Sequence, residues 1–560
     1  MYAPTRTELQ DAPPAASGAA IAKHDELLRR GLCGALAIVL AIFMGMIWAI
    51  LVKCGGRFIY PLDDPYIHLA LARNIAHGHY GLNPHEASAP SSSILWPLLL
   101  APFSFTRYFE YAPLAINLVL TLLTTSCLFA CFAGCLKRPA LAATLAVATV
   151  IASNAIGVAL TGMEHSLQMW LTVLVAYGLI QVNRGHHAPP SLAVALVLGP
   201  LVRYENMAVT LCACVYLLFA GRKDLAFIGL LLPAIGIAGF SLFLKSQGLG
   251  LLPSSVIAKT PMVAALGAGP SSFVVPTQVQ NMMGSIAWTM LNTLVTTLPQ
   301  RLATHFGLFA ILAVLGAFTL KPAKSVRLWI TFGLILLLQL VFGRIGWFQR
   351  YEVYLYPFGL AMLVYFRRKA LNAELSVPRQ AIRFAVIVLF LAVMGVESLQ
   401  TAYDTPLASA CVYRQQYQMM RFVRDYYRKP VAVNDLGEVS FGSGQYVLDL
   451  WGLGSQEALG ARLSSSGSTE WLGHVTERKN VGLAIIYAYL FPRLPDQWRA
   501  VGKMELHVPL KAVAGPTVYF YATHPGDEVR IAALLWQFGT TLPPGATMLI
   551  RPDLQRAARA

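Results

Sequence analysis

The sequence predicts a polytopic α-helical membrane protein with about eleven transmembrane helices, followed by a soluble α/β domain. Of the 560 residues, 56% are hydrophobic and only 12% are charged, whereas a typical soluble domain is about 25% charged. Long apolar runs dominate residues 31–397, while residues 401–560 have the mixed composition of a soluble protein. This contrast predicts a membrane domain over residues 29–400 and a water-exposed domain over residues 401–560.

The membrane domain consists of apolar runs close to the length that crosses a bilayer, about 20 residues. Two of them, residues 190–202 and 205–220, are short, and we expect neighbouring helices to bury them. The predicted spans are residues 32–52, 110–134, 139–160, 166–183, 190–202, 205–220, 225–244, 303–320, 326–343, 352–366 and 381–399.

Positive charge sets the predicted topology. Residues 1–28 are rich in Ala, Pro and polar side chains and are predicted to be a disordered tail, which Arg29 and Arg30 keep in the cytoplasm. The first apolar run has no small-residue cleavage site, so we interpret it as a retained helix. The net charge is +16, and much of the excess falls in short loops that this topology places inside. The charge therefore indicates contact with a lipid bilayer, and no motif indicates a nucleic-acid partner.

The remaining loops share the outer face, and eleven spans place the C-terminal domain on that face as well. The two longest outer loops are residues 53–109 and 245–302. Ionisable groups at a membrane surface are costly unless they are paired or hydrated, so their convergence predicts a functional site. The ionisable residues of the outer loops are Asp63, Asp64, His68, Glu164, His165, Arg203, Glu205, Lys259, Arg344, Arg350 and Glu352.

The adjacent carboxylates Asp63 and Asp64 are the centre of this predicted site. An Asp ahead of Pro65 is a good helix start, so one of the two suits a helix cap. Capping does not explain both. Two carboxylates this close raise one pKa, which suits proton transfer, and the same pair also suits a divalent cation such as Mg²⁺ or Mn²⁺.

The basic residues of the outer loops have two interpretations. Arg203 lies beside Glu205 and Arg350 beside Glu352, which is compatible with buried ion pairs. Guanidinium and ammonium groups also match phosphate oxygens, so these arginines together with Lys259 are candidates for a phosphate clamp. Histidines such as His68 and His165 are more often structural than catalytic.

Residues 401–560 predict a small α/β domain. Helical spacing marks residues 413–427, and strand patterns mark residues 431–437, 446–453, 481–488 and 517–522. A docking or stability module is the simpler interpretation of this domain. Asp449 and Trp451 are candidates for sugar binding, because carboxylates and aromatic faces suit carbohydrate.

Short motifs lie along most of the chain, at residues 63–68 with 72–74, 83–84 and 96–99, then at 161–164, 203–205, 253–259, 350–357, 434–437 and 449–453. Together they resemble the motifs of C-type (GT-C) membrane glycosyltransferases, in particular the family of the mycobacterial terminal arabinofuranosyltransferase. Each motif is weak alone, and their order along the chain makes the set specific. Pro65, Tyr204, His165 and Ser254 depart from the usual residues of the family and bear on the identity of the sugar more than on the fold.

The resemblance implies transfer of a sugar, arabinofuranose or a related pentose, from a polyprenyl-phosphate donor in the bacterial inner membrane. The acceptor would be a cell-envelope glycan, lipid or protein on the periplasmic side. Asp63 or Asp64 would deprotonate the acceptor, and Arg203, Lys259 and Arg350 would stabilise the departing phosphate. The implied sugar- or acceptor-binding residues are His68, Glu164, His165, Glu205, Tyr351, Asp449 and Trp451.

The alternative from another class is a multi-pass transporter or flippase of a lipid-linked or small polar substrate. Such a protein is expected to have internal repeats and ionisable residues near the middle of the membrane. Neither feature is clear in this sequence, because the charged groups fall at the ends of the predicted spans.

Overall fold

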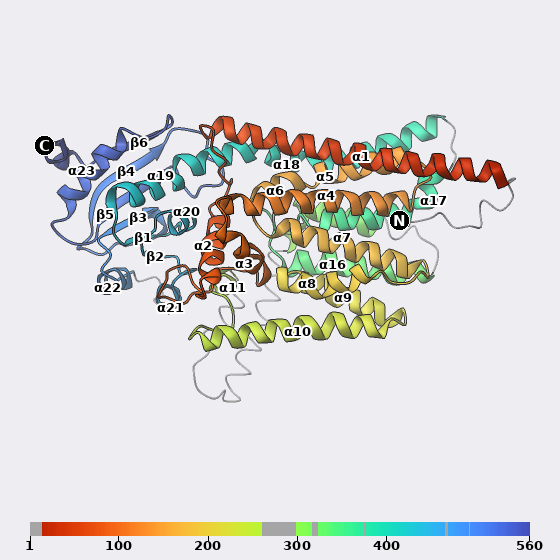
Figure 1. The fold of residues 1–560 in the computed structure, drawn as a ribbon, viewed down its shortest axis with the longest axis horizontal. Coiled ribbons are helices and arrows are strands. Elements are labelled where there is room, and N and C mark those ends of the chain that lie inside the picture. The colour runs from red at the N-terminus through yellow and green to blue at the C-terminus, as the bar shows by residue number, and fades with distance from the viewer. Residues whose placement is uncertain are drawn as a thin grey trace.

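The computed structural model describes residues 14–259, 298–315, 323–373, 377–464, 469–491 and 493–559. A bundle of long helices makes up one part of the molecule and a sheet covered by helices makes up the other (Figure 1). The predicted combination of a helical domain with apolar helices and a C-terminal α/β domain is therefore confirmed.

A helix lies at each of the eleven places where the sequence predicts a span. Four helical segments, Ile21–Lys53, Phe109–Ala133, His165–Asn183 and Lys223–Ser246, are long and apolar enough to cross a membrane and mark the chain as a membrane protein. The count of eleven spans stays a prediction. The helices are α1 (Pro14–Lys53), α4 (Ala112–Ala133), α5 (Pro139–Ala152), α6 (Ala155–Leu160), α7 (His165–Asn183), α8 (Pro190–Val202), α9 (Asn206–Phe219), α10 (Lys223–Ser246), α15 (His305–Leu315), α16 (Ala323–Phe342), α17 (Leu355–Asn372) and α18 (Val377–Arg414).

Three predicted boundaries differ from the structure. The tail predicted to be disordered over residues 1–28 is helical from Pro14, because an Ala-rich segment of high helix propensity leads into the apolar run; residues 1–13 lie outside the described part. The predicted span 139–160 is two helices, since Asn154 adopts a left-handed conformation (φ 53°) between α5 and α6. The domain boundary at residue 401 falls inside α18.

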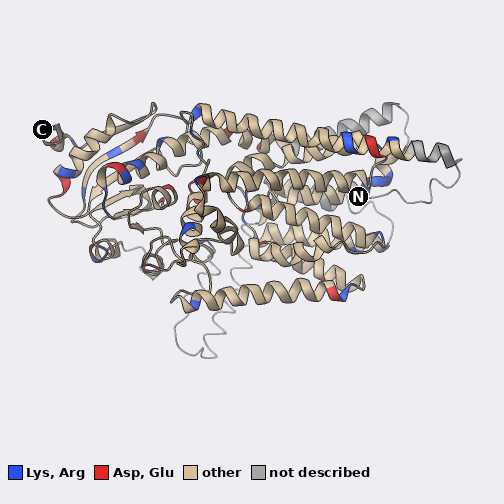
Figure 2. Ribbon diagram, viewed as in Figure 1, with Lys and Arg blue, Asp and Glu red and all other residues tan. Residues whose placement is uncertain are grey.

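The outer surface of the bundle is apolar where a bilayer would contact it. Trp48 on α1 is 68% exposed, and Phe227, Leu231 and Leu242 on α10 are 58–66% exposed. Figure 2 shows that the charged residues gather toward the ends of these helices and on the sheet domain. Exposed apolar side chains over such lengths of helix are the expected lipid contact.

The first outer loop lies between the bundle and the sheet domain (Figure 1). It contains helix α2 (Asp64–Ala76), which has Pro65 in its first turn, the short helix α3 (Leu95–Leu100) and two 3-10 turns, η2 (Ala101–Phe105) and η3 (Phe109–Tyr111). The first two turns of α2, residues 65–72, are buried on all sides. A helix therefore starts beside Pro65, as the sequence predicts.

The C-terminal sheet has six strands in the order β2-β1-β3-β5-β4-β6. Strand β1 pairs with β2 and β3 in parallel, and the other pairs are antiparallel. Four strands lie where the sequence predicts them. The other two, β4 and β6, were not predicted, because polar and exposed residues interrupt their apolar pattern. The strands are β1 (Val431–Val433), β2 (Val447–Asp449), β3 (Leu483–Ile486), β4 (Arg499–Leu506), β5 (Thr517–Ala522) and β6 (Ala546–Ile550).

Helices cover this sheet and connect its strands. The predicted helical segment 413–427 consists of α19 and a π-helical turn, η5. The short helix α20 follows β1 and contacts α2 of the first outer loop. The helical elements are α19 (Gln416–Arg421), η5 (Phe422–Tyr427), α20 (Gly437–Gly442), α21 (Gln456–Ser464), α22 (Trp471–Arg478), η6 (Ala488–Leu490), α23 (Glu528–Gly539) and α24 (Pro552–Arg559).

Candidate active site

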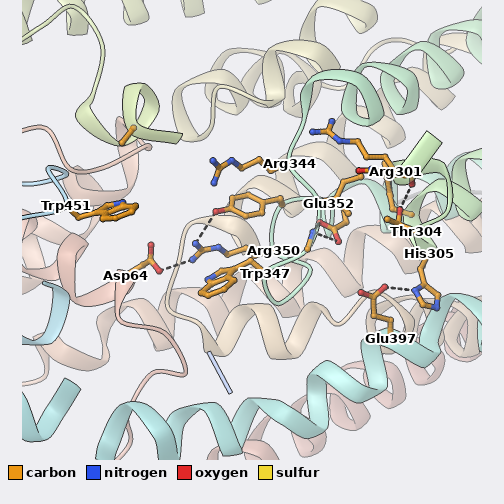
Figure 3. A pocket seen from close by; sticks show the side chains of 16 residues that line it. Asp64, Arg301, Thr304, His305, Arg344, Trp347, Arg350, Glu352, Glu397 and Trp451 are labelled. Atoms are coloured by element: carbon orange, nitrogen blue, oxygen red, sulfur yellow. Dashed lines mark hydrogen bonds and ion pairs between the residues drawn. The ribbon is translucent and has the colours of Figure 1, made fainter. Parts of the chain in front are cut away.

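A cavity of about 940 Å³ opens where the bundle, the first outer loop and the C-terminal domain meet. Asp64 comes from the start of α2, Trp451 from the loop after β2, and residues 344–352 from the connection between α16 and α17 (Figure 3). The far wall is formed by α14 (Leu298–Leu302), the start of α15 and Glu397 of α18. Segments that are distant in the sequence thus line one cavity.

Asp64 faces this cavity and pairs with Arg350. The Arg350 Nη1 atom lies 3.2 Å from the Asp64 Oδ2 atom, and its Nη2 atom donates to the Tyr351 hydroxyl at 3.1 Å. The Asp64 side chain is 26% exposed, whereas that of Arg350 is 4% exposed. The buried Nε of Arg350 has no hydrogen-bond partner among the described residues. A buried guanidinium with a spare donor beside a cavity is suited to a ligand oxygen.

Asp63 points away from Asp64 and toward the C-terminal domain. Its Oδ2 accepts a hydrogen bond from the backbone N–H of Gly437 at 2.5 Å, and its Oδ1 accepts from that of Glu438 at 2.8 Å. Asp63 occupies the N-cap position of α2 but makes no side-chain bond to that helix. Burial and the neighbouring Asp435 carboxyl raise the pKa of Asp63, against the opposing effect of the two N–H donors.

The printed partners of Asp63 and Asp64 are protein groups: two backbone N–H groups bind the Asp63 carboxylate, and the Arg350 guanidinium binds that of Asp64. Within the described ranges, no group of three or more His, Cys, Asp or Glu side chains has the arrangement of a metal site.

A buried ionic network lies next to the cavity and contains four of the predicted residues. Arg203 donates to both oxygens of Glu205, at 2.6 and 3.1 Å, and to Glu164 at 2.6 Å. Glu164 is fully buried and also lies 3.5 Å from the His68 ring; Ser91 contacts the other ring nitrogen of His68. Burial alone would raise the pKa of Glu164, but Arg203, with His68 and His165, holds it well below its usual range.

Tyr351 connects this network to the cavity. Its ring lies 5.1 Å from the Arg350 guanidinium, 5.7 Å from that of Arg203 and 5.9 Å from that of Arg344. The His165 ring meets it edge-on at 6.1 Å. Cations favour the face of an aromatic ring, so Tyr351 holds three arginines together that would otherwise repel one another.

The loop from residue 343 to 354 has an unusual backbone. Gly346, Trp347, Phe348 and Gln349 all have positive φ, between 51° and 92°, although only Gly adopts this conformation at no cost. The backbone N–H of Gly346 donates to both oxygens of Glu352, at 3.1 and 2.9 Å. Glu352 therefore pins the turn, and burial raises its pKa to about 8. Left-handed strain of this kind is typical of functional sites.

The two predicted Arg–Glu pairs have different outcomes. Arg203 and Glu205 form the expected ion pair. Arg350 pairs with Asp64 instead, because Glu352 turns back to the Gly346 backbone. Proximity in the sequence therefore does not predict an ion pair where the backbone reverses direction, as it does between Gly346 and Glu352.

Asp449 and Trp451 share a loop but have different positions. Asp449 is buried and accepts hydrogen bonds from the backbone N–H groups of Trp451 (2.8 Å) and Gly454 (2.7 Å), so it shapes the loop. Trp451 lines the cavity, and the Arg462 guanidinium lies 4.2 Å from its ring. In Figure 3, Asp64 lies between Trp451 and Arg350.

Other residues of the cavity were not assigned a role from the sequence. Arg344 and Glu352 were recognised only as outer-loop charges, and Trp347, Arg301 and the His305–Glu397 pair (2.8 Å) were not recognised. The density of Gly and Arg in residues 343–350 was the available signal. Lys259 ends helix α11 (Ser254–Lys259), next to the cavity-lining Ala258, and its side chain lies outside the described residues, as do residues 260–297 of the predicted outer loop.

The chain was compared with family models, curated proteins and solved structures. Residues 407–521 match a family described as a domain of unknown function, DUF8728. No curated protein matches the sequence. Among solved structures, an oligosaccharyltransferase from Archaeoglobus fulgidus, tethered to an acceptor peptide containing the NVT sequon, is similar over 92% of this chain and 76% of its own, at 11% identity and a TM-score of 0.41. This TM-score is too low to establish a common fold.

Proposed function

We propose that the chain is a glycosyltransferase that moves a sugar from a polyprenyl-phosphate donor to an acceptor on the periplasmic face of the bacterial inner membrane. The observation that carries the proposal is the cavity in which Asp64, Arg350 and Arg344 meet at the ends of apolar helices. A lipid-linked phosphate would reach such a cavity from the bilayer. The choice of a pentose such as arabinofuranose, and of a cell-envelope glycan, lipid or protein as acceptor, rests on the motif resemblance.

Asp64 is the proposed general base. Its carboxylate takes the proton of the acceptor hydroxyl, and the acceptor oxygen forms a bond to the anomeric carbon of the donor sugar. The bond between that carbon and the phosphate oxygen breaks, and its electron pair leaves with the polyprenyl phosphate. Asp63 is less suited to this step because both its oxygens already accept hydrogen bonds.

The leaving phosphate needs cationic partners, and Arg350 is the first of them. Its place in the lining of the cavity, beside Asp64, supports a direct contact of its guanidinium with a phosphate oxygen. Arg344 and Lys259 are the proposed second and third cations. Arg203 could contact phosphate only by releasing a glutamate, so its proposed role is to hold Glu164, Glu205 and Tyr351 in place.

Sugar contacts are proposed on the walls of the cavity. Trp451 offers an aromatic face on the side of the C-terminal domain, and Asp449 keeps its loop in place. Tyr351 lines the opposite wall, with His165 behind it. His68, Glu164 and Glu205 support this wall from the buried side through Arg203.

The test is a transfer assay on the purified full-length protein. A panel of polyprenyl-phosphate pentoses and hexoses is incubated with the protein, and release of polyprenyl phosphate is measured. We expect release with at least one donor and none with Asp64→Asn, while Asp496→Asn, an exposed carboxylate outside the cavity, keeps the wild-type rate. Release by Asp64→Asn at the wild-type rate would contradict the base assignment. Movement of an intact lipid-linked sugar across proteoliposomes without cleavage would favour a flippase.

A further inference from the structure

Two hydrogen bonds to Asp63, the residue beside the proposed base, join the first outer loop to the C-terminal domain. Asp63 is bound by the backbone N–H groups of Gly437 and Glu438, which lie 374 and 375 residues further along the chain. Asp64, the next residue, pairs with Arg350. The position of Asp64 therefore depends on three segments that only the folded chain brings together.

The turn that binds Asp63 is itself held firmly. It follows β1 at residues 434–438, where Asn434 accepts a hydrogen bond from the Tyr487 backbone N–H at 2.9 Å. Asp435 accepts one from Gln416 at 2.7 Å. Bonds to the residue that follows β3 and to α19 thus fix this turn, so it is a rigid support for the Asp63 carboxylate.

Position 437 has room only for glycine. A Cβ atom placed there would lie 2.0 Å from the Asp63 backbone oxygen and 2.8 Å from its Oδ2. The turn therefore approaches Asp63 more closely than any other residue type allows. By contrast, a Cβ at Gly460, in α21 of the same domain, meets no atom within 4 Å.

Further contacts join the first outer loop to the C-terminal domain along the length of α2. Arg73 donates to the carbonyl of Phe441 at 3.0 Å and lies 5.3 Å from its ring. Asn83 exchanges two hydrogen bonds of 3.0 Å with the backbone of Val447 in β2. Glu86 accepts a hydrogen bond from Tyr446 at 2.6 Å. The C-terminal domain thus contacts the first outer loop at both ends of α2, and Asp63 is the contact nearest to the cavity.

We infer that Asp63 is a positioning residue, through which the C-terminal domain sets the place of the Asp64 carboxylate relative to Arg350. The inference rests on the proposed function, because it concerns the base of that reaction. It assigns the two adjacent carboxylates separate tasks and makes the C-terminal domain part of the catalytic apparatus. A base displaced by about 1 Å loses on the order of 100-fold in rate. We therefore expect the contact of Asp63 with Gly437 and Glu438, called the Asp63 clamp below, to affect turnover more than donor binding.

Hydrogen–deuterium exchange of the full-length protein tests the clamp without any substrate. In Asp63→Asn, one carboxylate oxygen is replaced by an NH₂ group that faces a backbone N–H donor. In Gly437→Ala, the new methyl group pushes the turn at residue 437 away from Asp63. Both variants should exchange faster in peptides covering residues 58–70 and in those covering residues 434–442. The controls Gly460→Ala and Asp496→Asn should exchange like the wild type. Unchanged exchange in Asp63→Asn would overturn the inference.

Steady-state kinetics with the donor identified above test the consequence for catalysis. Asp63→Asn and Gly437→Ala should lower kcat on the order of 100-fold with KM nearly unchanged, and should keep the wild-type pH profile because the base is still present. Complete loss of turnover in Asp63→Asn with wild-type exchange would make Asp63 the base and overturn the inference. No release of polyprenyl phosphate by the wild-type protein with any donor would instead refute the proposed function, and the exchange result would stand separately.

Discussion

Arg203 and Arg350, which both contact the Tyr351 ring, differ in what surrounds them. Arg203 is bound by two glutamates, whereas Arg350 has one carboxylate partner and a spare Nε. Motifs in the sequence identified both residues. Their different tasks follow from the turn of the backbone between Arg350 and Glu352, which sequence spacing does not reveal.

Arg203 should matter for stability. Arg203→Met leaves Glu164 buried without its cation, and breaking a buried pair in this way costs about 3–5 kcal/mol. Thermal unfolding of the purified variant should show a large fall in melting temperature relative to the wild type. Adding Glu164→Gln to this variant should restore part of the stability, because the uncompensated charge is removed. A single variant that unfolds like the wild type would contradict the role of Arg203 as the centre of the network.

Trp451 should matter for substrate affinity. One sugar ring stacked on its face is worth on the order of 1 kcal/mol, so Trp451→Ala should raise KM about 5-fold while kcat changes little. The measurement is initial rate against the concentrations of donor and acceptor separately. An unchanged KM for both substrates would remove Trp451 from the site.

The loop between α16 and α17 is the element that hydropathy predicts least. Residues 326–343 and 352–366 were recognised as apolar runs, and helices lie there. The left-handed turn between them depends on the hydrogen bond from Gly346 to Glu352, which no local sequence pattern predicts. For the same reason the Asn154 break and strands β4 and β6 were not predicted, since local conformation and cross-strand pairing decide them.

Glu352 should make stability depend on pH. Its pKa is about 8 in the folded protein against an ordinary 4.5, so the folded state binds more protons than the unfolded state between these values. The unfolding free energy should therefore fall as pH rises through this window. Glu352→Gln removes the titration and keeps an acceptor for Gly346. Melting temperatures from pH 5 to 9 should fall more steeply for the wild type than for this variant, and parallel curves would contradict the assignment.

At the scale of the whole molecule, apolar runs and basic loops in the sequence predicted the two-part architecture. The sequence also placed Asp64, Arg350 and Trp451 among the candidates, and the cavity brings these three together. It did not predict that Asp63 would contact residue 437, because such a contact is a property of tertiary packing between segments more than 370 residues apart.

The predicted topology can be tested by labelling single cysteines in a Cys33→Ser background, since Cys33 is the exposed cysteine of the described chain. Asp496→Cys and Asp224→Cys are both at exposed positions, one on the C-terminal domain and one at the start of α10. A charged maleimide added to intact spheroplasts should label position 496, and position 224 only after permeabilisation. Labelling of both positions from the same side would contradict the predicted topology.

The long sequence separation within the Asp63 clamp has a consequence for how the protein is made. Helix α2 leaves the ribosome early, but the Gly437 and Glu438 backbone that satisfies Asp63 follows only after more than 370 further residues. Domains generally fold in the order of synthesis, so the Asp63 carboxylate lacks its two backbone donors until residues 437 and 438 have been synthesised. A prematurely terminated product would display an unsatisfied carboxylate at its surface and lack the assembled cavity. The cavity is thus completed only after the C-terminal domain has been synthesised.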